Sequence, residues 1–155
     1  MIKHKEALYE IMDAEMQTGQ SLAGYCDIIL KTSISKLPSD ANKFLMLGDF
    51  STIAIESGRI KQKFLIINQD IICGGVENLH NQDGEVDAEE WAFNLVKIVR
   101  TILRNNQQLV SASYATGVAK ASYIQDAPQE FVFFYDSSCC IHTLKLELHV
   151  EEDDS

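Results

Sequence analysis

Apolar residues recur at helical spacing in two segments of the chain. In residues 4–17, Ala7, Leu8, Ile11 and Met12 fall on one face of a helix. In residues 88–105, apolar residues repeat at intervals of three and four, at Trp91, Leu95, Ile98, Val99 and Ile102. Such spacing is typical of amphipathic helices that lie on a sheet. We therefore expect an N-terminal helix and a central helix, each with one buried face.

The central helix also has start and stop signals. Asp87 is a candidate N-cap, and Glu90 stands three residues later, as in a capping box. Three cations, Lys97, Arg100 and Arg104, lie in its C-terminal half, where positive charge is favourable for the helix dipole.

Strand patterns occupy most of the remaining chain. Residues 139–150 alternate, with Leu144, Leu146, Leu148 and Val150 on one face and polar residues on the other. Further β-prone runs are residues 43–47, 51–56, 60–73, 109–125 and 130–135. Residues 57–59 read as a hairpin turn, Gly74 and Gly75 as the end of a strand, and Gly117 as a bend.

Three segments are less regular. Residues 20–35 suit either a helix or a strand near residues 27–30, and a loop follows Pro38. Residues 74–86 form a long polar loop, a kind of segment that is often functional. Residues 151–155 form an acidic C-terminal tail that we expect to be frayed.

The order of elements predicts an α+β fold. We expect a mostly antiparallel twisted sheet with the N-terminal and central helices packed on one face. A chain of 155 residues fits one domain, which we place at residues 1–150, followed by the acidic tail 151–155.

Charge and hydropathy exclude several classes of function. The net charge is −10, from 13 Lys and Arg against 23 Asp and Glu. Nucleic-acid binders and proteins that bind anionic membranes need clustered cations, so both classes are disfavoured. Apolar runs are far shorter than the roughly 20 residues of a membrane span. The N-terminus leads into a charged amphipathic segment, so we expect synthesis in a reducing cytoplasm.

Known catalytic patterns are missing from the sequence. Cys140 and His142 stand two apart on a predicted strand, and a Cys–His dyad is conceivable, but packing of Cys140 in the core is the favoured interpretation. The four cysteines form no CxxC pair, so no zinc site is expected. We interpret them as buried thiols, with a disulfide between subunits as the alternative. Asp83 and Glu85 flank Gly84 but supply too few ligands for calcium. We therefore expect no enzyme activity, cofactor or metal.

Two segments are candidates for contacts with other proteins. Phe131, Phe133 and Tyr135 lie on one face of a predicted strand whose neighbouring residues are also large and apolar. Both faces of that strand must be covered, by the core or by another subunit. In the long loop, Asn78, His80, Asp83 and Glu85 are the candidates for contact with another protein. Trp91 reads as a core residue more readily than as an interface anchor.

The arrangement of residues 43–150 resembles that of the tail terminator (tail completion) proteins of long-tailed bacteriophages. The resemblance runs from the strand ending in residues 64–67, through the loop, the central helix and the Gly117 strand, to the closing strand at residues 144–148. It implies a structural virion protein at the tail–neck junction. Such a protein forms a ring, usually a homohexamer, that caps the head-proximal end of the tail tube and stops tube polymerisation.

The same resemblance implies the partners. They are other copies of the chain, the tail tube protein, a neck or head completion protein and, in a contractile tail, the sheath protein. DNA would pass through the ring without specific binding, and six copies would carry about −60 (6 × −10), which disfavours adhesion of phosphate. The alternatives are another ring protein of the neck, such as a head–tail connector, and a small cytoplasmic adaptor domain that binds a protein.

Overall fold

A computed structural model describes residues 2–32, 41–56, 62–77, 83–134 and 137–153. Its elements, in chain order, are α1 (Lys3–Ala14), β1 (Ile28–Leu30), β2 (Lys43–Glu56), β3 (Gln62–Val76), α2 (Gly84–Asn105), β4 (Lys120–Asp126), β5 (Glu130–Phe134) and β6 (Ser137–Asp153). The predicted α+β class is confirmed.

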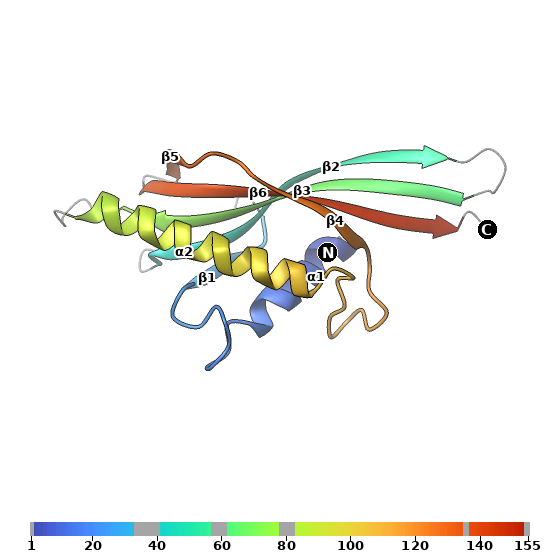
Figure 1. The fold of residues 1–155 in the computed structure, drawn as a ribbon, viewed down its shortest axis with the longest axis horizontal. Helices are drawn as coiled ribbons and strands as arrows, with labels where there is room; N and C mark the ends of the chain where they lie inside the picture. The colour runs from blue at the N-terminus through green and yellow to red at the C-terminus, as the bar shows by residue number, and fades with distance from the viewer. Residues whose placement is uncertain (1, 33–40, 57–61, 78–82, 135–136, 154–155) are drawn as a thin grey trace.

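The described strands form one sheet in the order β1-β2-β3-β6-β4, and β5 also pairs with β6. β1 runs parallel to β2, and all other pairs are antiparallel. Both helices lie on the same face of the sheet, as predicted (Figure 1). The sheet is long, since β6 alone has 17 residues and therefore spans roughly 50 Å.

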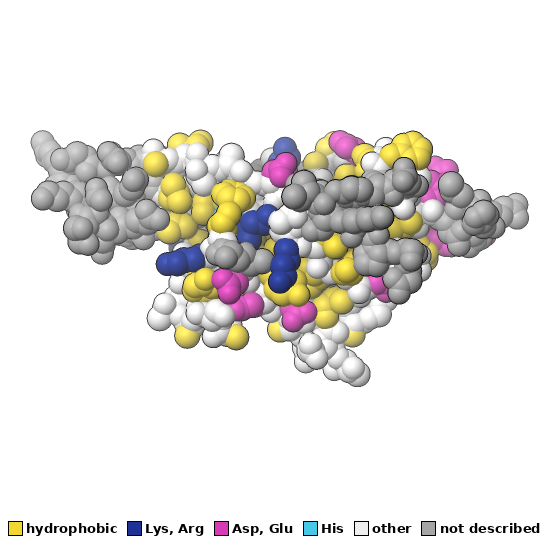
Figure 2. Space-filling view, turned by 180° about the vertical axis from the view of Figure 1, so that it is seen from behind, with side chains coloured by type: hydrophobic (Ala, Val, Ile, Leu, Met, Phe, Trp, Pro, Cys, Tyr) yellow, Lys and Arg dark blue, Asp and Glu magenta, His cyan; other side chains and the backbone are white. Residues whose placement is uncertain are grey.

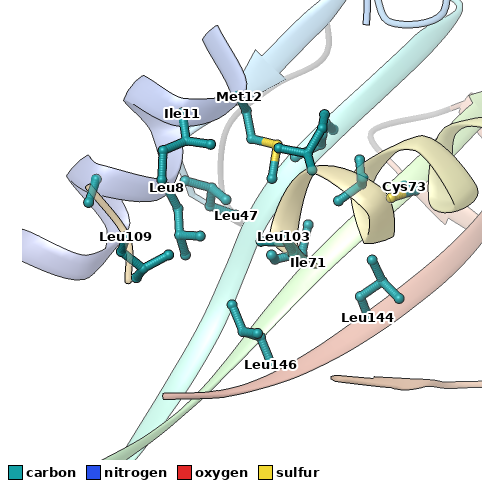
Figure 3. Close-up of a cluster of buried hydrophobic side chains, with 14 of the residues drawn as sticks. Leu8, Ile11, Met12, Leu47, Ile71, Cys73, Leu103, Leu109, Leu144 and Leu146 are labelled. Atoms are coloured by element: carbon teal, nitrogen blue, oxygen red, sulfur yellow. The ribbon is translucent and has the colours of Figure 1, made fainter. Parts of the chain in front are cut away.

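The main core lies between the two helices and this face of the sheet (Figure 3). Leu8 and Met12 of α1 and Leu103 of α2 are fully buried there against Ile71 of β3 and Leu144 of β6. The alternation predicted for residues 144–148 is confirmed, because Leu144, Leu146 and Leu148 all face the helices. Burial of each such side chain contributes about 1.5–3 kcal/mol, so this layer is the main source of stability.

The opposite face of the sheet carries a smaller apolar cluster. Phe44, Met46 and Cys139 are buried in it together with Leu30 of β1. Consecutive strand residues point to opposite faces. Cys139 therefore belongs to this cluster, whereas Cys140 packs against α2 on the other face, so the two adjacent thiols lie on opposite faces of the sheet.

β2 joins two segments that the sequence predicted separately, residues 43–47 and 51–56. The strand continues through a register shift between Leu47 and Phe50. Gln69 of β3 lies beside this bulge, and its side-chain amide donates hydrogen bonds to the carbonyls of Gly48 and Asp70, at 2.9 and 2.8 Å. These hydrogen bonds satisfy backbone carbonyls near the bulge. The chain can therefore continue as the single strand β2 where two separate strands were predicted.

The expectation that Gly74 and Gly75 end a strand is wrong, because β3 continues through both to Val76. A Cβ atom on Gly74 would lie 2.2 Å from the ring of Phe44, and one on Gly75 would lie 2.4 Å from the carbonyl oxygen of Ala88. The two glycines therefore allow close packing on both faces of the sheet and do not form a turn.

The central helix begins earlier than predicted. α2 starts at Gly84, so Asp83 and not Asp87 occupies the N-cap position. The loop predicted at residues 74–86 is therefore shorter, because residues 74–76 belong to β3 and residues 84–86 belong to α2. Trp91 is half-buried at the margin of the core, with the Lys43 ammonium 5.6 Å from its ring centroid. The innermost positions of α2 belong to Ala88, Ala92, Leu95 and Val99.

Two further expectations need correction, and the alternative left open for residues 20–35 is settled in favour of a short strand. Residues 109–125 are not one strand: β4 begins only at Lys120, after turns that include Leu109 and Gly117, both with positive φ. The ambiguous segment 20–35 has turns followed by the short strand β1 in its described part. Residues 151–153, expected in a frayed tail, continue β6 and pair with residues 62–64 of β3. The predicted turn at residues 57–59 and Pro38 lie outside the described residues.

Candidate assembly surfaces

One end of the molecule exposes aromatic side chains. Phe133 is 85% exposed and Phe131 is 44% exposed. Phe131 pairs with Cys140 of β6 and Phe133 pairs with Ser138. Directly paired residues share a face of the sheet, and Cys140 packs against α2, so both rings lie on the face that carries the helices. Tyr135, the third residue predicted for this interface, lies outside the described residues.

Helix α2 adds two apolar side chains to the same end. Phe93 is about half exposed and Val86 is largely exposed. The ring of Phe93 lies 6.4 Å from that of His142, which follows Cys140 on β6 by two residues. We use the name aromatic end for the exposed side chains of Val86, Phe93, Phe131 and Phe133.

The described ends of the predicted contact loop lie at this end as well. The backbone N–H of Glu77, at its start, donates to the carbonyl of Ser138 at 2.7 Å, and the Ser138 hydroxyl donates to the Glu77 carboxylate at 2.8 Å. The loop therefore leaves the sheet beside the start of β6, where β5 pairs. Figure 1 shows β5 and the N-terminus of α2 together, far from the C-terminus.

Of the four loop residues that the sequence singled out, two are described. Asp83 is exposed and immediately precedes α2, and Glu85 is exposed in the first turn of that helix. Asn78 and His80 lie outside the described residues. The structure thus brings the two predicted contact segments to one end of the fold, a proximity that sequence reasoning did not find.

The Cys140–His142 pair has the features of packed side chains. The Cys140 thiol is buried under Ala88 and Ala92 of α2. Its burial, followed by the nearby carboxylates of Glu89 and Glu85, raises the pKa of the thiol to about 11. Burial lowers the pKa of His142. At neutral pH the thiol is therefore protonated and weakly nucleophilic, so this pair lacks an activated nucleophile.

A polar cluster that the sequence did not predict anchors the N-terminal helix. Gln69 is fully buried, and both donors of its amide are used by backbone carbonyls. Its Oε1 therefore accepts from Nε2–H of the buried His4, at 2.9 Å. Burial lowers the pKa of His4, which is consistent with a neutral ring. In the sequence Gln69 stands between Asn68 and Asp70 and looks like one of three polar strand residues, and only its burial shows the role.

A basic pocket lies where the C-terminal half of α2 faces β4. Its volume is about 460 Å³, and its lining includes Arg100 and Arg104 over an apolar floor of Leu103, Ala121 and Ile124. Arg100 is ion-paired with Asp126 of β4. We call this site the basic pocket. Its lining residues come from the C-terminal half of α2, the turn that follows and β4, which lie toward the middle of the molecule, whereas β5 and the start of α2 lie at one end (Figure 1).

The surface of the molecule is mixed in character. In the view from behind, hydrophobic side chains reach the surface near both ends of the described part, and charged side chains of both signs lie between them (Figure 2). The described residues include no cluster of three or more side chains suited to a metal ion. No helix in the described part of the chain is long and apolar enough to span a membrane.

Comparison with known proteins gives a likeness of fold. No family model matches the sequence, and no curated protein sequence matches it. Among solved structures, the fold is similar to that of a chain in the "virion of native gene transfer agent (GTA) particle". The TM-score is 0.55 at 12% sequence identity, and the alignment covers 96% of this chain and 94% of that chain.

Proposed function

We propose that this protein is a structural component of a phage-like virion and, more specifically, a tail terminator. In this role it forms a homohexameric ring on the head-proximal end of the tail tube, stops tube polymerisation and joins the tail to the neck. Its partners are the tube protein, a neck or head completion protein and, in a contractile tail, the sheath protein. DNA passes through the ring without specific binding.

The likeness to the gene transfer agent chain carries this proposal. It covers nearly the whole of both chains, so it concerns the complete arrangement of helices and strands and not a common substructure. Fold alone does not determine function. The virion role therefore rests on the likeness together with the resemblance in element order, and both lead to the same class of protein.

The surface of the protein is compatible with ring assembly. Phe133 is 85% exposed on β5, which pairs with β6 alone among the described strands, and such a large apolar side chain is stabilised when another subunit covers it. The protonated Cys140 thiol gives no support to the alternative of a Cys–His hydrolase. We infer that the protein acts through its surfaces and has no catalytic role.

Loss of the protein from its particle tests the proposal. A particle without its tail terminator should produce tails whose tubes exceed the normal length and carry no heads, because nothing stops polymerisation. Negative-stain electron microscopy measures both features. Headless tails of normal length would instead assign the protein to a connector of the neck, and normal particles would exclude both roles.

A monomeric adaptor is tested separately by particle mass. Light scattering after size exclusion, at several concentrations and in the presence of the tube protein, should show a hexamer of about 104 kDa (6 × 17.4 kDa). A mass that stays at one or two copies under all these conditions would favour the adaptor.

A further inference from the structure

Acidic and basic residues are segregated in the middle of the sequence. Residues 76–90 contain six Asp and Glu and no Lys or Arg, whereas residues 91–125 contain four Lys and Arg and no Asp or Glu. The boundary falls within α2, so the helix is acidic in its first turns and basic in its later ones. Part of this pattern suits the helix dipole. The turns after the helix and most of β4, which belong to the basic part, are outside the reach of that effect.

The fold converts this division into two separate surfaces. The acidic part borders the aromatic end, where the exposed Glu85 and Glu89 lie near Cys140, which pairs with Phe131. Two of the four cations of the basic part, Arg100 and Arg104, line the basic pocket, whereas Lys97 lies over the ring of Phe93. Glu89 and Arg104 are 15 residues apart on one helix, which corresponds to roughly 22 Å. One copy of the chain therefore cannot bring the two surfaces together by itself.

The chemistry of the two surfaces is complementary. Guanidinium groups pair with carboxylates in a bidentate fork and stack on aromatic rings. The basic pocket offers the Arg104 guanidinium above an apolar floor, next to Arg100, which is ion-paired with Asp126. The aromatic end offers rings and carboxylates. The chain already uses a related contact internally, because the Lys97 ammonium lies 4.7 Å from the ring centroid of Phe93.

We propose that the aromatic end of one copy docks into the basic pocket of the next copy, with Phe133 against the apolar floor and Glu89 near Arg104. This inference rests on the proposed ring. Because the two surfaces differ, the contact is heterologous, and repetition of a heterologous contact closes a ring when the rotation per copy is a simple fraction of a turn. The occupant of the basic pocket is thus a second copy of this chain.

Disulfide trapping tests the contact. All four native cysteines are buried, so exposed cysteines can be introduced without competition from native thiols. Phe133→Cys and Gln107→Cys, made in separate chains and mixed under mild oxidation, should form one cross-linked species of two copies. A chain that carries both substitutions should form a ladder up to the closed ring. Phe133→Cys mixed with Ile53→Cys, on an exposed side chain far from the basic pocket, is the matched control.

Charge exchange provides a second measurement. Arg104→Glu and Glu89→Arg should each reduce self-association at least tenfold, and the double variant should recover most of the loss. Phe133→Cys that cross-links only with itself would indicate a two-fold contact and overturn the proposal. Equal cross-linking to Gln107→Cys and Ile53→Cys, or no rescue by the double variant, would also overturn it. If the wild-type chain still forms a hexamer in those cases, the proposed function stands and only the contact is wrong.

Discussion

The substitution Phe133→Glu separates assembly from folding. Phe133 is 85% exposed, so the folded monomer gains little from its ring. If a second copy covers it, the substitution removes apolar burial of about 2 kcal/mol. It also places a carboxylate in a desolvated contact, which adds at least about 2 kcal/mol. A total of about 4 kcal/mol corresponds to a weakening of roughly 10³-fold for each contact between copies.

The measurement is particle mass as a function of concentration, together with circular dichroism and a urea unfolding curve. We expect the variant to remain monomeric at concentrations where the wild type is fully assembled, with an unfolding midpoint close to that of the wild type. Phe133→Leu should retain most of the assembly. Ile53→Glu provides a matched control, because Ile53 is 55% exposed and its pairing through Ile66 leads to His149, at the end of β6 opposite to Ser138, the partner of Phe133.

Two results would refute this reasoning. If Phe133→Glu assembles with the affinity of the wild type, the aromatic end is not a contact between copies. If the variant unfolds, the side chain belongs to the folded core in solution. Phe44→Ala is a reference for a substitution in the core, because Phe44 is 1% exposed. Its truncation should lower the free energy of unfolding by about 3–5 kcal/mol without a specific loss of assembly.

Three further predictions concern the fold and the loop. Gly75→Ala should lower the unfolding midpoint sharply in a thermal melt, because its Cβ would lie 2.4 Å from the carbonyl oxygen of Ala88, whereas Gly48→Ala, whose Cβ would come no closer than 3.3 Å to Asp70, should have a much smaller effect. The free energy of unfolding should fall as pH drops below about 6.5, because the pKa of buried His4 is lowered and the unfolded chain therefore binds the proton first. In urea titrations, His4→Gln should make the free energy of unfolding less dependent on pH. An unchanged pH dependence would contradict the assignment. Deletion of residues 78–82 should preserve the melting temperature and impair joining of tails to heads; normal joining would remove the loop from the contact.

The deletion stops before Asp83 for a structural reason. The carbonyl of Asp83 accepts the backbone N–H of Asp87 at 2.9 Å, so removal of Asp83 would disturb the first turn of α2 as well as the loop. The sequence alone indicated a loop up to residue 86, and a deletion designed from it would have confused the two effects.

Sequence periodicity correctly predicted the helices and strands that bury one face and expose the other. The alternation in residues 144–148 and the helical repeat in residues 88–105 both place apolar groups on a single buried face, and both were correct in type. The start of α2 was missed because Glu85, Val86 and Asp87 are not fully buried and carry no periodic apolar signal. Gly74 and Gly75 were misread because a glycine required for close packing has the same appearance in sequence as a glycine in a turn.

The candidate surfaces were predictable only in part. Consecutive aromatic residues indicated that β5 needs cover on both faces, and the exposure of Phe131 and Phe133 is consistent with that argument. The basic pocket could not be predicted, because Arg100 and Ile124 meet only through the pairing of β4 with β6. The same limit applies to Gln69, whose burial depends on a bulge in another strand.

The acidic residues lie at the two opposite ends of the sheet, which limits where negative charge could face the channel of a ring. Asp83 and Glu85 lie at the aromatic end, whereas residues 151–153 end β6 at the other end of a sheet roughly 50 Å long (Figure 1). This distance is several times the Debye length of about 8 Å at physiological salt, so the two groups act independently. If the aromatic end is covered by a neighbouring copy, the acidic groups beside it are used in that contact. If DNA passes through such a ring, as the proposed function requires, its repulsion would then depend on the far end of the sheet, where β6 terminates in acidic residues.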